Sequence, residues 1–411
     1  MKPEGPASIL GFAQARQRAP GHIALPVCVF LLALGFYWFN LHLFAPAMFT
    51  HSGNVIGDPN ETVGYMRKLT FAGDMLKHTL FSATTAPLVS VFQRALRLSQ
   101  DESLLLVLAL VAALNITGTF LLLRSLLASA GFALLFASIF AFFFFNLVLF
   151  SIPETYALSD LYIVVYLSFL LRAKATPGWR TGLGLSFLAG LASLYNPPLL
   201  SLILIQIVRF FDRSRIRSWL GSSLASLALG GVLFLSINLL THGSAYAPYV
   251  SQYGGKNFSV ANLLHPRYGA TVFVNFFLYS ILAPVGNLPD YLGLQSLAGY
   301  LHSPLRGTLL AILEAGVFGG MFMAVARKTS YQRLALGLLV WILLMLVFYT
   351  CYTPHDASLW SLQILLPLLI ILAIAFKTIQ VGPWVKSGAV LLISAMVAVN
   401  NCLAFYAGPA R

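Results

Sequence analysis

The chain has 411 residues, of which 59% are hydrophobic, 13% aromatic and only 9% charged. Water-soluble domains carry about 25% charged residues and about 45–50% apolar ones, so this composition excludes an ordinary soluble enzyme, a disordered chain and a nucleic-acid-binding domain. The three cysteines are widely spaced, which excludes a disulfide scaffold. The composition instead fits a protein that crosses a lipid bilayer several times.

Apolar runs of about 18 or more residues recur along the sequence, and each can cross the roughly 30 Å hydrocarbon core as a helix. A lone strand cannot cross, because its backbone groups would lack partners in lipid. We therefore expect an all-α fold, a polytopic transmembrane helical bundle of about 11 spans (up to 13). It would form a single domain over 1–411 with no separate soluble domain. The clearest runs are 23–45, 103–123, 128–149, 155–171, 218–240, 306–326, 334–351, 358–376 and 387–406.

Three further segments depart from this simple pattern. The first, 49–101, is the longest polar stretch and is expected to form the first extracytoplasmic loop, with helices lying in the interface plane. The second, 181–208, holds two short apolar runs around Asn196 and two prolines, with basic flanks, which predicts a short helical hairpin. The third, 271–285, is apolar but short, so the sequence leaves open whether it crosses the membrane.

Basic residues predict the orientation, because lysine and arginine collect on the cytoplasmic side of membrane helices. The net charge of +13 comes from 25 Lys and Arg against 12 Asp and Glu. With a cytoplasmic N-terminus, 16 of the 25 basic residues fall on the inner side. This topology places on or near the outer face the acids Asp58, Glu61, Asp74, Glu154, Asp290 and Asp356. Either these acids form an outward-facing site, or short outer loops simply hold the available polar residues.

Acidic residues in two places carry the candidate chemistry. Asp58 and Glu61 lie three positions apart in a Gly-Asp-Pro-Asn-Glu turn, where they can act as base and electrostatic partner or can bind a metal. The alternative is helix capping at the start of the following helix. Glu154 stands where a span enters the bilayer, and an acid there costs free energy unless it is paired or lines a cavity. The alternative for Glu154 is a favourable first-turn acid.

Two histidine motifs are candidates for binding an anion. His78 follows Lys77 in the first predicted loop and can bind phosphate or transfer a proton. His355 can supply a cation for a phosphate, and Asp356 can orient it or cap the next helix. A polar surface position or a helix cap is the simpler explanation for His78.

Three other polar residues complete the set of candidates. Arg267, followed by Tyr268, can bind a phosphate through its planar fork of donors, although snorkelling at the interface explains it equally well. Asn196 stands at the predicted helix break. Broken helices at membrane depth must line a cavity or be buried in protein, so Asn196 is expected to face a polar pocket.

Several common catalytic motifs are absent from the sequence. There is no P-loop, GxSxG, HExxH or clustered Cys/His set, so we expect neither nucleotide hydrolysis, nor serine-hydrolase chemistry, nor a zinc site.

Five motifs follow one another in a fixed order along the chain. They are Asp58-Pro59-Asn60-Glu61 with Tyr65, then Ala86-Pro87-Leu88, Glu154-Thr155-Tyr156, the segment 190–198, and His355-Asp356 before Pro367. In this order they resemble the GT-C superfamily of integral-membrane glycosyltransferases. The nearest similarity is to its bacterial branch, which includes the aminoarabinose transferase of lipid A and relatives of the protein O-mannosyltransferases. Where the family pattern has a lysine this chain has Asn196, and the late arginine of the pattern is also missing.

The resemblance implies an inverting enzyme of a bacterial inner membrane, with a polyprenyl-phosphate sugar as donor and an acceptor at the outer face. It implies catalytic roles for Asp58 as general base and for Glu61 or Glu154 as its assistants. The residues implied in substrate binding are His78, Tyr156, Asn196, Arg267, Tyr268, His355 and Asp356. No cofactor is expected beyond the lipid-linked donor, which is a substrate. A need for a divalent metal, the sugar, the acceptor (glycan, lipid or protein) and the oligomeric state stay open.

Two other functions compete with sugar transfer. A transporter or lipid flippase would use the same outer-face polar residues as a substrate pathway, but its polar residues should continue into the cytoplasmic halves of the spans. Here those halves read as Leu, Ile, Val and Phe with few polar breaks, which favours the enzyme. The long acidic outer loop argues against a non-catalytic scaffold.

Overall fold

The structure is a computed structural model that describes residues 21–50, 79–152, 155–173, 179–212, 216–243, 257–283, 304–354 and 357–407. Within these ranges the regular structure is helical, apart from an isolated bridge between Phe258 and Tyr352. Among the described residues, seven helices are long and apolar enough to cross a membrane. The prediction of an all-α membrane protein is therefore confirmed, whereas the larger number of spans and the interfacial helices stay predictions.

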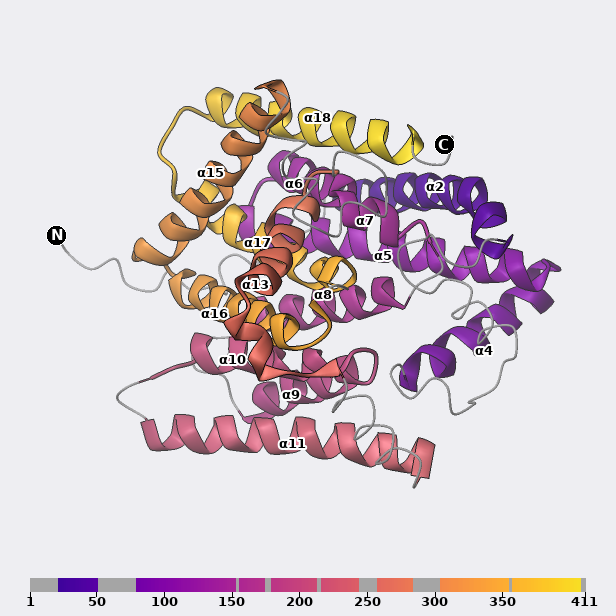
Figure 1. The fold of residues 1–411 in the computed structure, drawn as a ribbon, viewed down its shortest axis with the longest axis horizontal. Helices are drawn as coiled ribbons and strands as arrows, with labels where there is room; N and C mark the ends of the chain where they lie inside the picture. The colour runs from indigo at the N-terminus through magenta and orange to yellow at the C-terminus, as the bar shows by residue number, and fades with distance from the viewer. Residues whose placement is uncertain are drawn as a thin grey trace.

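The long helices include both the buried centre of the bundle and much of its outside (Figure 1). They are α2 (Gly21–Thr50), α5 (Gln100–Leu127), α11 (Ile216–His242), α15 (Pro304–Ala326), α16 (Gln332–Cys351), α17 (Ala357–Thr378) and α18 (Pro383–Ala407). Of these, α17 and α5 are the most buried, whereas α2, α11 and α18 are largely exposed. Exposed apolar helices on the outside are expected where lipid is the solvent.

Shorter helices fill the spaces between the long ones. They are α4 (Thr79–Leu96), α6 (Ala130–Phe142), α7 (Phe144–Leu149), α8 (Tyr156–Arg172), α9 (Trp179–Ser193), η2 (Pro197–Leu202), α10 (Ile203–Arg209), η5 (Val260–Leu264), α13 (Pro266–Val274) and the π-helical turn η6 (Asn275–Tyr279). Figure 1 shows α8 beside α17 near the centre and α9 between this centre and α11. Of the predicted first outer loop, 51–78 lies outside the described residues, and α4 is its described helix.

The single span predicted over 128–149 is wrong in one respect, because the helix breaks at Phe143 between α6 and α7. A break frees backbone carbonyls, which are costly to leave unpaired in an apolar interior. Side-chain donors satisfy three consecutive carbonyls here. The carbonyl of residue 140 accepts from Asn146, that of residue 141 from Tyr37, and that of residue 142 from Asn401. Hydropathy alone cannot show this, because two of the three donors come from distant helices.

The turn after α9 is held in place by its surroundings. The helix ends at Ser193, and a short 3-10 helix begins at Pro197, which suits a first helical position because proline has no N–H to lose. The hydroxyl of Tyr166 donates to the carbonyl of Leu202 at 2.8 Å. The indole of Trp341 donates to the hydroxyl of Ser201 at 2.9 Å. These bonds from α8 and α16 fix η2, and with it the position of Asn196 just before it.

Basic side chains gather at the end of the bundle opposite the turn at Asn196, where they donate hydrogen bonds to carbonyls at the ends of other helices. Lys377 donates to a carbonyl in the last turn of α5, at 3.0 Å. Arg327 donates to the last carbonyl of α17, at 2.6 Å. Arg209 donates to carbonyls at the end of α8. Cations are favourable at helix C-termini, because the unpaired carbonyls there carry partial negative charge. These three cations are among the basic residues that the sequence assigned to one side of the membrane, and they lie at the same end of the bundle.

Candidate functional site

Four of the ten predicted site residues lie in the part of the chain that the structure describes. These are Tyr156, Asn196, Arg267 and Tyr268. The other six, which lie outside the described residues, are Asp58, Glu61, His78, Glu154, His355 and Asp356. The described neighbours of these six nevertheless show which segments come together.

An aromatic cluster joins the start of α8 to the connection between α16 and α17. The cluster comprises Tyr156, Tyr349, Tyr352 and Trp360. The Trp360 ring stacks on Tyr349 with centroids 5.0 Å apart, and it meets the Tyr156 ring edge-on at 5.3 Å. Its centroid is 6.3 Å from that of Tyr352. Tyr156 is two residues from Glu154, and Tyr352 and Trp360 flank His355 and Asp356. Two of the predicted acidic segments are therefore anchored on one cluster.

Asn196 reaches the same cluster from α9. Its side chain is only 1% exposed and lies beside the hydroxyl of Tyr349. That hydroxyl donates to Oε1 of Gln363 at 3.3 Å, so the surroundings of Asn196 are polar. Within the described residues, Nδ2 of Asn196 makes no hydrogen bond of standard geometry, and its polar neighbour is the Tyr349 hydroxyl.

The described part of the predicted outer loop approaches this turn as well. The hydroxyls of Thr84 on α4 and Tyr195 lie 2.8 Å apart, within hydrogen-bond distance. The Tyr195 ring also packs against Tyr162 of α8, with centroids 4.8 Å apart. Helix α4 is thus attached directly to the residue that precedes Asn196.

The backbone just before His355 is strained. Thr353 has a φ of +40°, a left-handed conformation that residues other than glycine rarely adopt. Its hydroxyl is buried and has no hydrogen-bond partner among the described residues. Such conformations cost on the order of 1–3 kcal/mol and cluster at functional sites.

Arg267 and Tyr268 lie near the same end of α16. The segment that leads to them is fixed on the last residues of that helix, because the backbone N–H of Ser259 donates to the carbonyl of Cys351 at 2.8 Å. The side chain of Asn262 donates to the same carbonyl. Arg267 is exposed, whereas Tyr268 is half-buried and packs against the ring of His265.

Sequence reasoning missed one acidic residue of the interior. Asp160 lies one turn after Tyr156 on α8 and is fully buried, and neither of its carboxyl oxygens has a hydrogen-bond partner within the described ranges. Ala157 accepts a 2.7 Å hydrogen bond from Asn115 of α5, whereas Tyr156 faces Trp360 of α17. Residues three and four apart share a helix face, so Asp160 lies between α5 and α17. The signal was an acid inside an apolar run, which is costly and usually functional.

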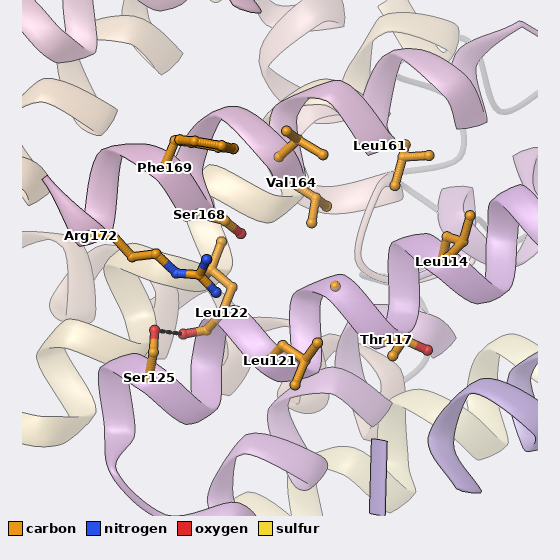
Figure 2. A pocket seen from close by; sticks show the side chains of 12 residues that line it. Leu114, Thr117, Leu121, Leu122, Ser125, Leu161, Val164, Ser168, Phe169 and Arg172 are labelled. Carbon is orange, nitrogen blue, oxygen red and sulfur yellow. Dashed lines mark hydrogen bonds between the residues drawn. The ribbon is translucent and has the colours of Figure 1, made fainter. Parts of the chain in front are cut away.

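A groove of about 310 Å³ runs between α5 and α8 (Figure 2). Leucine and valine side chains make up half of its lining residues, and Leu121 and Phe169 are exposed. Figure 2 shows Arg172 at one end, with its guanidinium turned toward Ser125 and Leu122. Because Arg172 ends α8, the groove opens toward the basic end of the bundle, away from the aromatic cluster.

The described ranges contain no group of three or more His, Cys, Asp or Glu side chains that could hold a metal ion. Comparison of the chain with protein-family models gives no match, and comparison with curated protein sequences gives none either.

Proposed function

We propose that the chain is an integral-membrane glycosyltransferase that moves a sugar from a polyprenyl-phosphate donor to an acceptor at the outer face. One observation carries the proposal. Four segments that the motifs singled out, far apart in sequence, meet at one end of the bundle. They are α4, the start of α8, the turn at Asn196 and the connection between α16 and α17.

The chemistry assigns a role to each side of this site. Asp58 is the general base that takes the proton from the acceptor hydroxyl, with Glu61 or Glu154 assisting, and the sugar carbon inverts. A base needs only to lie within hydrogen-bond reach of that hydroxyl. The leaving group is a lipid phosphate, on which negative charge develops as the glycosidic bond breaks. Donors fixed around a developing charge lower the barrier, and we assign this role to the amide of Asn196, which is buried beside the Tyr349 hydroxyl.

We infer the membrane orientation from the end of the bundle at which the basic side chains gather. Lysine and arginine favour the cytoplasmic side. We therefore place the basic end at the inner face of a bacterial cytoplasmic membrane, with a cytoplasmic N-terminus, and the aromatic cluster at the outer half. Polyprenyl-phosphate sugars in the outer leaflet then reach the site from the lipid.

The deciding experiment is Asp58→Asn in membranes that contain the full chain, supplied with radiolabelled polyprenyl-phosphate pentoses and hexoses. Transfer of label to the membrane fraction should fall to background while the protein level is unchanged. Asp74→Asn is the matched control, because it removes another acid of the same predicted loop outside the motif. Wild-type turnover in Asp58→Asn at a wild-type protein level would falsify the proposal.

Asp160 favours a second candidate, a transporter or lipid flippase. Buried acids within membrane helices often serve in proton relays and substrate pathways. The Asp160→Asn variant distinguishes the two functions. A transporter should lose lipid or substrate movement across proteoliposomes in this variant, whereas a glycosyltransferase that uses Asp58 should keep its sugar transfer.

A further inference from the structure

A basic pocket lies at the end of the bundle opposite the aromatic cluster. It has a volume of about 520 Å³ and lies between the loop that joins α15 to α16 and the last turn of α17. Its polar lining comprises Arg327, Lys328, Thr329, Ser330, Lys377 and Thr378, besides Gln380 and the phenol of Tyr331. No carboxylate of the described residues lines the pocket, so the three cations meet only the partial negative charge of the carbonyls at the ends of α5 and α17.

Two of these cations are held rigidly. The guanidinium of Arg327 donates to the carbonyl of Thr378 at 2.6 Å. The ammonium of Lys377 donates to the end of α5 and lies 4.7 Å from the centroid of the Tyr331 ring. These contacts use only some of the donors of each group. The remaining N–H groups, together with the pocket hydroxyls, are available to an anion.

Lys328 has no such structural task. Its side chain is exposed, and the structure gives it no hydrogen bond or ion pair within the described residues. Helix-end capping therefore explains Arg327 and Lys377 but leaves Lys328 unexplained. A third cation beside two fixed ones raises the positive potential of the pocket, which favours a ligand with a phosphate group.

The surroundings indicate that the phosphate belongs to a lipid. Helices α15 and α17 are both long and apolar enough to cross a membrane, so their ends lie at the depth of lipid headgroups. One turn before the end of α15, and five residues before Arg327 of the pocket, Phe322 is 74% exposed. Acyl chains can pack there while the headgroup enters. Basic pockets between helices on the cytoplasmic side are a known form of anionic lipid site.

We propose that this pocket binds the phosphate of an anionic phospholipid of the cytoplasmic leaflet, independently of the sugar-transfer site. The purified full chain in detergent is titrated with dioleoylphosphatidylglycerol and with dioleoylphosphatidylcholine, and bound lipid is measured by native mass spectrometry. Phosphatidylglycerol should bind more tightly. Lys328→Gln should weaken it about fivefold, because one cation near a lipid surface contributes about that much. Lys328→Arg keeps the positive charge, so this variant should bind phosphatidylglycerol about as tightly as the wild type.

Arg217→Gln is the matched control, because Arg217 is an exposed cation near the start of α11 and does not line the pocket. It should leave lipid binding unchanged. An unchanged thermal unfolding midpoint shows that Lys328→Gln is folded. Equal affinity for the two lipids, or equal loss in Lys328→Gln and Arg217→Gln, overturns the proposal. Full competition by glycerol 3-phosphate at the same concentration also overturns it, since the site would then recognise a free phosphate ester.

Discussion

The hydroxyls of Thr84 and Tyr195 lie 2.8 Å apart, although 111 residues separate them in the sequence. This contact fastens α4, the described helix of the predicted outer loop, to the turn before Asn196. Asp58, the base that we propose, precedes α4 in the sequence. The contact therefore brings the described part of the predicted outer loop to the turn that holds Asn196.

Asn196→Leu should reduce sugar transfer by roughly 100-fold, the loss that follows removal of one preorganised donor from a developing negative charge. Leucine has nearly the same shape, and the amide makes no hydrogen bond of standard geometry with the described residues beyond its approach to the Tyr349 hydroxyl, so stability should change little. The measurement is label transfer in membranes at matched protein levels.

Ser193→Ala is the control for this variant, since Ser193 is buried three residues away and bonds only to the Gly190 carbonyl of its own helix. Its transfer rate should stay close to wild type. Equal sugar-transfer rates in Asn196→Leu and the wild type would show that the amide does not stabilise the phosphate of the sugar donor.

Asp160→Leu should leave the thermal unfolding midpoint of the detergent-solubilised chain unchanged or raise it. The carboxyl group is buried without a hydrogen-bond partner among the described residues, so an apolar side chain of similar size removes a desolvation cost and no favourable contact. Asn115→Leu is the contrasting variant, because it breaks the 2.7 Å bond to the carbonyl of Ala157 and should lower the midpoint. A clear drop in Asp160→Leu would mean that the acid has a structural partner.

The helices themselves were predictable from hydropathy. The run at 103–123 became α5 (Gln100–Leu127), whose start is fixed by a capping box between Ser99 and Glu102. The break at Asn196 was also predictable, since the two prolines after it lie where η2 begins. Both features depend on local residue types, which a single sequence displays directly.

The break at Phe143 and the role of Asp160 were not predicted, for different physical reasons. An apolar run looks continuous whether or not its helix breaks, because the donors that make a break tolerable come from Tyr37 and Asn401, far away in the chain. Asp160 was visible as an acid within a span. Its lack of partners depends on packing against α5 and α17, which only the three-dimensional structure shows.

Gly118→Ala should destabilise the chain by about 1–3 kcal/mol through overpacking of α5 against α8. A methyl group at this position would lie 2.6 Å from Cγ1 of Val164. Thermal unfolding in detergent measures the loss. The second change Val164→Ala removes the clashing atom, so the double variant should be more stable than the two separate losses predict.

Gly184→Ala on α9 is the control for Gly118→Ala, because nothing lies within 4 Å of its added methyl group. Alanine has the higher helix propensity, so this variant should be slightly more stable than the wild type. Additive losses in Gly118→Ala and Val164→Ala would contradict the close approach of the two helices.

Asn401→Leu should cost about 2–3 kcal/mol, because one side chain on α18 makes three hydrogen bonds to backbone groups that helix breaks leave free. Its Nδ2 donates to the carbonyls of Phe142 and Ile281, both at 2.7 Å, and its Oδ1 accepts from the N–H of Ala283 at 2.8 Å. Leucine fills the space but removes all three hydrogen bonds in an apolar interior. Ser394→Ala on the same helix removes a bond to its own backbone only and should cost much less. If both variants unfold at the same temperature, the freed carbonyls have other donors, and the break at Phe143 does not depend on α18.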